Sequence, residues 1–417
     1  MVTAFRRFLQ STYGGLPAVT WLICVAAFVN RAGAMVLPFL SLYLLRRFGL
    51  DVQQAGFLVS LYGIGSVLGN LVGGKLTDVL GPVRVQLVTL TAAALWMWTM
   101  TQFTTLWLLG PGIFVLGLLN DSFRPGNMSA ILASVPPHLG PLALTLNRVF
   151  VNAGWAIGPT IGGHLAKLDY DWLFVADGAT CALAALVLWW KVPIDLGDAH
   201  QLEHRKSVAA AKDAGVTIQS DRSPWHDGKF LLLLLANVIT LLAFMQYFST
   251  ESRYLEATFA CDEEDIGNLL AINPLLIVLL EMPLVRSLRG RAPLPFVAFG
   301  TFLIGLAFLL LVPAHWAMPG VIAQMVLLTV GEMFSFSPLG GFVGDRASSG
   351  RRGQYLGLHG AAFSFAFVLA PTLGGMTYKH LGADALWYGC FVLATISTLG
   401  YLALHRVYRR ADAGTDG

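Results

Sequence analysis

The stretch GWAIGPTIGG at residues 154–163 decides the fold, because it recurs as AFVLAPTLGG at residues 366–375. Small residues, a proline and paired glycines keep the same order in both stretches. Just upstream of each, SFRP at residues 122–125 has a counterpart in SFSP at residues 335–338. A chain that repeats such segments half its length apart is predicted to consist of two related halves.

The repeated segments lie in long apolar runs, and a membrane-spanning helix needs about 20 such residues. Hydrophobic residues make up 56% of the 417 and charged residues 12%, against about 25% charged in soluble domains. Backbone polar groups cannot be left unpaired in hydrocarbon, so each run is predicted to be a helix. The predicted fold class is an all-α membrane protein of about twelve transmembrane helices in two pseudo-symmetric six-helix bundles. The runs are residues 16–45, 52–73, 83–103, 105–133, 141–166, 171–190, 229–254, 264–285, 293–313, 317–342, 354–378 and 384–406.

One long polar stretch splits the twelve runs six and six. We predict an N-terminal six-helix bundle at residues 1–190, a cytoplasmic linker at 191–228 and a C-terminal six-helix bundle at 229–417. A short surface helix is expected within the linker, around residues 208–214.

Positive charge in the loops predicts the orientation of the chain. If both termini are cytoplasmic, 19 of the 27 lysines and arginines lie on the cytoplasmic side and five outside, as the positive-inside rule favours. An acidic segment, residues 251–265, then falls outside. We therefore expect a multi-pass protein of the cell (inner) membrane with both termini in the cytoplasm.

Several function classes lack their motifs in this sequence. There is no phosphate-binding G-x-x-x-x-G-K-[ST] loop, no nucleophile and base at motif spacing, and a net charge of only +3. We therefore expect no enzyme activity, no cofactor or metal and no nucleic-acid partner. The expected partners are a small-molecule substrate, protons and the lipid bilayer, and the expected state is a monomer driven by a proton gradient. The cysteines lie far apart and indicate no metal site or disulfide framework; they are Cys24, Cys181, Cys261 and Cys390.

The segment GKLTDVLGPVR at residues 74–84 resembles the signature loop of the major facilitator superfamily. Residues 154–163 resemble the fifth-helix motif that is common in the antiporters of this family. The resemblance covers the whole chain and implies a transporter with a cytoplasmic latch at the loop. The helix motif implies close packing and a bend beside the substrate cavity. The gating and structural residues carried over are Asp78, Gly81, Arg84, Gly158, Pro159 and Pro371.

The match departs from the family pattern at three positions. Val79 and Pro82 stand where the loop usually has basic residues, and Thr145 stands where the fifth-helix motif has an earlier glycine. The departures at Val79 and Pro82 predict a weaker latch, and Thr145 weakens the antiporter reading.

Weaker similarities concern the subfamily. Residues 123–127 and the pair Asn30 and Arg31 resemble parts of the proton-coupled oligopeptide transporters, but Ala27 and Asn30 replace the glutamates of that group. Residues 280–283 resemble the eighth helix of bacterial sugar exporters. We predict proton-coupled efflux of drug-like compounds, with import of peptides or export of sugars as alternatives. A non-transporting membrane sensor ranks last because the termini and linker are short.

Ionisable residues inside the apolar runs are costly and usually face a cavity or a partner. Asp121 and Arg124, three residues apart, share a helix face. They form either a self-neutralising pair or a pair that opens when substrate or a proton competes. Glu332 has no basic residue within a turn, and desolvation suits a carboxyl group to proton exchange. A hydrogen bond to another helix, or a position nearer water, is the alternative. Glu332 and Asp121 are the proton-coupling candidates.

Other polar side chains in the runs are candidates for a substrate cavity. Arg31 is predicted either to bind an anionic group or to pair with an acid from another helix. His359 is predicted either to titrate near neutral pH or to be a hydrogen-bonded packing residue. The substrate-cavity candidates are Asn30, Arg31, Arg124, Asn152, Gln246, Tyr247, Asn273, Tyr355 and His359.

Overall fold

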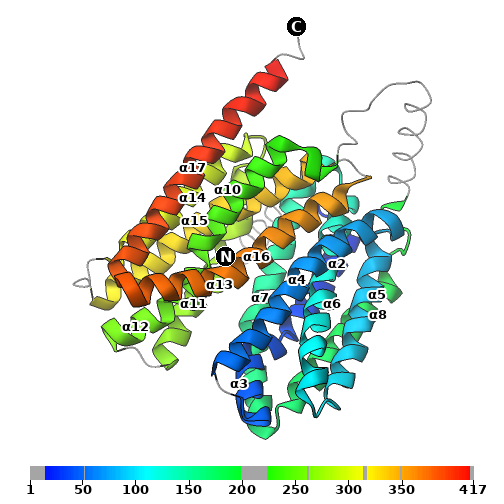
Figure 1. Ribbon diagram of the computed structural model, residues 1–417. Helices are drawn as coiled ribbons and strands as arrows, with labels where there is room; N and C mark the ends of the chain where they lie inside the picture. Colours follow the sequence, from blue (N-terminus) through cyan, green and yellow to red (C-terminus); the bar gives the residue numbers. More distant parts are fainter. Residues whose placement is uncertain are drawn as a thin grey trace, which may run out of the picture. The chain divides into compact units, whose positions relative to one another are not determined.

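The computed structural model describes residues 15–50, 52–198, 223–260, 263–312, 317–347 and 350–413, and within these ranges it contains helices and no strand (Figure 1). All twelve predicted apolar runs are occupied by helix. Nine helical spans in the described part of the chain are long and apolar enough to cross a membrane. The predicted linker helix at residues 208–214 and Cys261 lie outside the described residues.

Among the described residues, seven α-helices lie before residue 198 and eight lie after residue 223. The first set is α2 (Ala18–Ala32), α3 (Val36–Phe48), α4 (Val52–Leu80), α5 (Pro82–Met100), α6 (Leu106–Ala133), α7 (Gly140–Leu168) and α8 (Asp171–Lys191). The second set is α10 (Gly228–Phe244), α11 (Gln246–Ser249), α12 (Glu251–Phe259), α13 (Glu263–Ser287), α14 (Pro293–Leu309), α15 (Ala317–Arg346), α16 (Arg352–Leu381) and α17 (Ala383–Ala413).

The chain divides into two compact units. Unit 1 comprises residues 1–223 and 343–364, and unit 2 comprises residues 224–342 and 365–417. The end of α15 and the first half of α16 therefore belong to unit 1, a grouping that hydropathy does not indicate. The sequence-based boundaries at 1–190, 191–228 and 229–417 stay a prediction.

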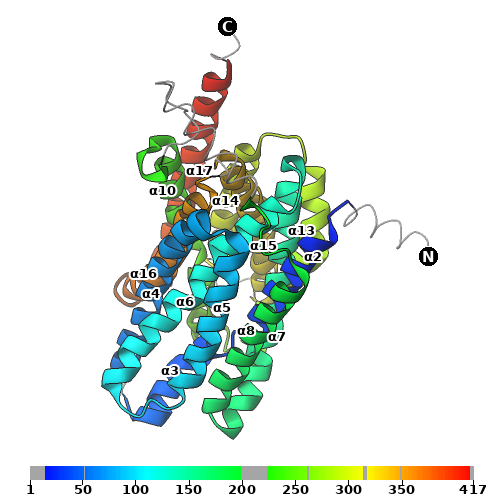
Figure 2. The same ribbon diagram turned by 90° about the vertical axis from the view of Figure 1, so that its right-hand side faces the viewer.

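Glycines on α4 bring the helices of unit 1 close together. Helix α4 packs along α6, α5 packs on α6 and α8, and α2 packs on α7 and α8 (Figure 2). A Cβ atom added at Gly73 of α4 would lie 2.6 Å from Ser122 Cα on α6. Small residues at such a crossing let the two backbones approach. The contact places the polar face of α6 directly against α4.

The glycines of residues 154–163 form the face of α7 that packs on α2 and the start of α3. A Cβ atom at Gly154 would lie 2.8 Å from Arg31 Cβ, and one at Gly158 would lie 3.1 Å from Ala32 O. The motif therefore sets the position of Arg31, one of the predicted cavity residues.

Unit 2 packs α10 and α14 on α17. At the contact of α14 with α15, a Cβ atom at Gly331 would lie 2.7 Å from Gly300 O. Within the second copy of the repeated segment, Gly374 of α16 lies where a side chain would overlap Gln246 of α11. Both contacts require glycine for the same steric reason.

Two of the predicted continuous helices are interrupted in the structure. The run at 16–45 breaks at residues 33–35, where Asp177 of α8 accepts a hydrogen bond from the Val36 backbone N–H at 3.4 Å. This carboxylate satisfies an N–H group at the start of α3 that has no partner within the helix. The run at 229–254 breaks at Met245 and Thr250, which separate α10, α11 and α12.

Candidate functional site

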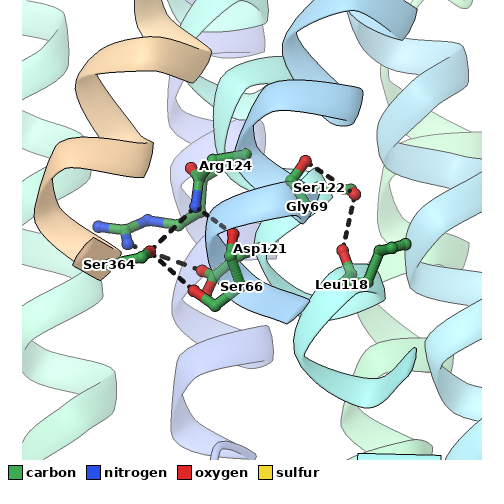
Figure 3. A network of polar contacts seen from close by, with 8 residues as sticks. Ser66, Gly69, Leu118, Asp121, Ser122, Arg124 and Ser364 are labelled. Atoms are coloured by element: carbon green, nitrogen blue, oxygen red, sulfur yellow. Dashed lines mark hydrogen bonds and ion pairs between the residues drawn. The ribbon is translucent and has the colours of Figure 1, made fainter. Parts of the chain in front are cut away.

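Figure 3 shows a polar cluster inside unit 1, here called the Asp121 cluster and defined as Ser66, Asp121, Arg124 and Ser364. The Asp121 carboxylate on α6 accepts a hydrogen bond from the Ser66 hydroxyl on α4, and Arg124 Nη1 lies 3.6 Å from Asp121 Oδ1. Ser66 Oγ is also hydrogen-bonded to Ser364 Oγ on α16, at 2.7 Å. Asn70 Nδ2 donates to the same Ser364 oxygen at 3.2 Å. The hydrogen bonds of the Asp121 cluster thus connect α4, α6 and α16.

The local sequence explains why α6 presents this carboxylate. Ser122 hydrogen-bonds to the carbonyl oxygens of Leu118 at 2.7 Å and Gly69 at 3.0 Å, which fixes the rotation of α6 against α4. Pro125 has no N–H group, so the backbone carbonyl of Asp121 loses its helical hydrogen bond. Asp121 and Arg124 therefore lie on one face of α6, at the turn where the helix lacks a backbone hydrogen bond.

The two members of the ion pair differ in exposure. The side chain of Asp121 is 10% exposed and that of Arg124 is 35% exposed. The Arg124 guanidinium also lies over the Phe363 ring, 5.0 Å from its centroid, at a distance typical of a cation–π contact. Arg124 therefore keeps a ring contact and partial exposure if it leaves the carboxylate.

Arg31 on α2 is a second positive charge close to the Asp121 cluster. It lies within electrostatic range of Arg124 and of Asp177, and it forms no ion pair with any side chain that the structure describes. This arrangement suits the binding of an anionic group.

The other candidates of unit 1 are engaged locally. Asn30 donates to Cys181 Sγ at 3.3 Å, and Asn152 donates to the Arg148 carbonyl of its own helix at 2.9 Å. His359 lies within electrostatic range of Arg124, whereas Tyr355 is buried, with 4% of its surface exposed. His359 is therefore close enough to Arg124 to sense its charge.

Glu332 lies in unit 2 and is buried. Asn273 of α13 donates from Nδ2 to the Glu332 carboxylate and lies 3.2 Å from Thr329 Oγ1 on α15. The alternative in which Glu332 bonds to a neighbouring helix is therefore the geometry observed. An amide can serve both an ionised and a protonated carboxyl group, so this partner is compatible with proton exchange.

Gln246 and Tyr247 hold the backbone of unit 2. Gln246 Nε2 donates to the Ala370 carbonyl at 2.9 Å, immediately before Pro371, and Thr250 donates to Gln246 Oε1 at 2.8 Å. The Tyr247 hydroxyl donates to the Leu270 carbonyl at 3.1 Å. These contacts indicate a packing role for two residues that the sequence assigned to the cavity.

The residues of the signature loop make two separate contacts within unit 1. The Asp78 carboxylate accepts hydrogen bonds from the backbone N–H groups of Gly353 at 2.7 Å and Gln354 at 2.9 Å. These groups begin α16, and a helix N-terminus attracts negative charge. Arg84 instead pairs with Asp198, at 2.7 Å between Nη1 and Oδ2. Gly81 begins α5 with a φ of 94°, a value that favours glycine.

These contacts predict unequal effects for the two loop residues. Asp78→Asn leaves one N–H group facing an amide N–H, and is expected to lower the free energy of unfolding by about 2 kcal/mol. Arg84→Gln removes a partly exposed pair and is expected to cost less than about 1 kcal/mol. The thermal unfolding midpoint in detergent measures both. Equal midpoints for Asp78→Asn and wild type would contradict the contact at α16.

The sequence-based predictions do not include two features of these hydrogen-bond networks. Ser66 and Asn70 lie four residues apart on one face of an apolar helix, a spacing that could have indicated the network around Asp121. The sequence predicts an acidic outer segment at residues 251–265, yet the structure buries Glu251 completely. Tyr247, Glu251 and Tyr254 follow helical spacing, which is the signal that could have identified it.

The sequence matches one family profile and resembles known proteins over most of its length. The sequence profile described as "Major Facilitator Superfamily" matches residues 22–358 and 238–417. The "Uncharacterized MFS-type transporter YqjV" of Bacillus subtilis (strain 168) is 22% identical over 405 residues, which cover 95% of each chain. The "Na(+), Li(+), K(+)/H(+) antiporter" of Planococcus maritimus is 24% identical over 411 residues, which cover 91% of this chain and 94% of the relative.

One further relative matches part of the chain, and one solved structure has a similar fold. The "Multidrug resistance protein MdtG" of Proteus mirabilis (strain HI4320) is 26% identical over 163 residues, which cover 38% of this chain and 40% of the relative. The solved structure of "the human organic anion transporter MFSD10 (TETRAN)" superposes with a TM-score of 0.77 at 16% identity, covering 92% of this chain and 100% of that one. At this identity the structural likeness concerns the fold.

Proposed function

The chain belongs to the major facilitator superfamily, and from this premise we propose that it is a proton-coupled exporter of small drug-like molecules. The proposed architecture is twelve transmembrane helices in two six-helix bundles, in the inner membrane, with both termini in the cytoplasm. Transport proceeds by alternating access, in which the two halves rearrange about a substrate site. Relatives named as an antiporter and as a multidrug resistance protein support exchange and drug-like substrates.

The Asp121 cluster carries the proposal. Its carboxylate accepts from the Ser66 hydroxyl on α4, which is itself hydrogen-bonded to Ser364 on α16, and it pairs with a cation that is one-third exposed. Protonation of Asp121 would remove the attraction to Arg124 and weaken the contact with Ser66. The proton would thereby release Arg124 toward substrate and loosen α16 from α4. Glu332 is the second proposed proton-coupling residue.

An anionic substrate is the second candidate, because Arg31 and Arg124 lie within electrostatic range of each other in unit 1. A carboxylate of a peptide or another organic anion would bind between such groups with charge-assisted hydrogen bonds. This reading differs from the first in the charge of the substrate, and Arg31→Gln would weaken transport of anions more than of lipophilic cations.

Everted membrane vesicles test the function directly. A proton gradient is established by respiration, and lipophilic cations, organic anions, sugars and short peptides are added in turn. The expected result is that at least one lipophilic compound dissipates the gradient in vesicles that contain the protein, but not in matched vesicles without it. A gradient that no compound changes, together with substrate counterflow in proteoliposomes, would show a transporter without proton coupling.

A further inference from the structure

Unit 2 contains a buried acid–amide pair outside the networks described above. Glu251 begins α12 and is 0% exposed, and Gln324 on α15 is also 0% exposed. Gln324 Nε2 donates to Glu251 Oε2 at 3.3 Å. Glu251 Oε1 and Gln324 Oε1 are both buried and have no hydrogen-bond donor among the described groups. The contact between Glu251 and Gln324 therefore contains two acceptor oxygens that have no donor among the described groups.

Among the side chains that the structure describes, those within electrostatic range of Glu251 include Tyr247 on α11, Tyr254 on α12 and Cys390 on α17, none of which carries a positive charge. Tyr247 also lies within range of Glu332. No ion pair to Glu251 exists within the described ranges. A charged carboxylate at this position would thus be buried with no counter-ion from the side chains that the structure describes.

A carboxylate that is buried without a cation is costly, and such a group takes up a proton instead. The Gln324 amide suits either state, because it donates to a carboxylate and, turned by half a rotation, accepts from a carboxylic acid. The added proton supplies the donor that the two unpaired oxygens lack. The geometry thus fits a residue that holds a proton better than one that holds a charge.

We propose that Glu251 and Gln324 form a proton-binding site of unit 2, separate from Glu332 and from the Asp121 cluster. It goes beyond the proposed function, since it requires neither substrate nor transport. The ligand is a proton, and the amide keeps the carboxyl group hydrogen-bonded before and after it binds.

Infrared difference spectroscopy of the reconstituted full-length protein tests the site without a transport assay. Spectra are recorded between alkaline and acidic pH for wild type, Glu251→Gln and Glu332→Gln. Glu256→Gln is the matched control, because Glu256 lies on the same helix and is exposed. We expect a carbonyl band of a protonated carboxylic acid in wild type, Glu332→Gln and Glu256→Gln, and loss of one such band in Glu251→Gln.

A second variant keeps the test decisive if Glu251→Gln does not fold. Gln324→Met retains the carboxyl group and removes its amide partner, so the band should shift in frequency and titrate at a different pH. Identical spectra for wild type and a folded Glu251→Gln would overturn the proposal, as would a band that Gln324→Met leaves unchanged. Failure of the vesicle assay would leave this infrared result unaffected, so the two proposals fail separately.

Discussion

Asp121→Asn is expected to reduce gradient-driven transport by at least about tenfold, equivalent to roughly 1.4 kcal/mol, while the protein remains folded. Asparagine keeps the size of the side chain and an oxygen that can accept from Ser66. It removes the titratable group and the counter-charge of Arg124. Transport in proteoliposomes with and without an imposed pH gradient measures the loss.

Two controls separate coupling from folding for Asp121. Asp171→Asn removes a carboxylate of the same unit that pairs with Arg47 at 3.7 Å, and should leave transport unchanged because exposed pairs contribute little. The double variant Asp121→Asn with Arg124→Gln removes both charges of the pair, so neither is left without its partner. If that double variant regains gradient-driven transport, the pair only neutralises itself and the coupling role is wrong.

The positions of the helices were predictable because hydropathy is a local property. The predicted run at 105–133 compares with α6 at Leu106–Ala133, and the run at 171–190 with α8 at Asp171–Lys191. A span of about 20 apolar residues has one stable form in a bilayer, namely a helix. The interruption at residues 33–35 was not predictable, because it depends on Asp177 from another helix.

The partners of the predicted charges depend on contacts that are distant in sequence. Asp78 bonds to N–H groups more than 270 positions away, and Ser66 to Ser364 across 298 positions. Spacing alone can identify neighbours on one helix, such as Asp121 and Arg124. It cannot identify a backbone N–H at the start of another helix, which has no residue-type signature.

The burial of Glu251 is a second feature that sequence alone does not predict. Its acidic neighbours in residues 251–265 suggest an exposed segment, since charged residues are rarely buried unless paired. Tertiary packing reverses that expectation, because Tyr247 on α11 and Glu251 and Tyr254 on α12 are all buried. Burial of one member of a charged segment is decided by which face of the helix it occupies, and acidic composition alone does not indicate that face.

Glu332→Gln is expected to uncouple transport from the proton gradient and leave substrate exchange intact. Glutamine imitates the protonated acid, and its oxygen can still accept from Asn273. The hydrogen bond between α13 and α15 is therefore kept while the titration is lost. Counterflow at equal pH should match wild type, whereas accumulation driven by a pH gradient should fall by about tenfold or more, roughly 1.4 kcal/mol.

Asn273→Ala distinguishes a coupling role for Glu332 from a structural one. This variant removes the amide donor and leaves the carboxyl group in place, so gradient-driven accumulation should persist. If Glu332 were only a packing residue, Asn273→Ala would lower stability and Glu332→Gln would be nearly silent in both assays. Normal gradient-driven accumulation by a folded Glu332→Gln would therefore exclude Glu332 as the proton carrier and leave Asp121 or Glu251 to supply it.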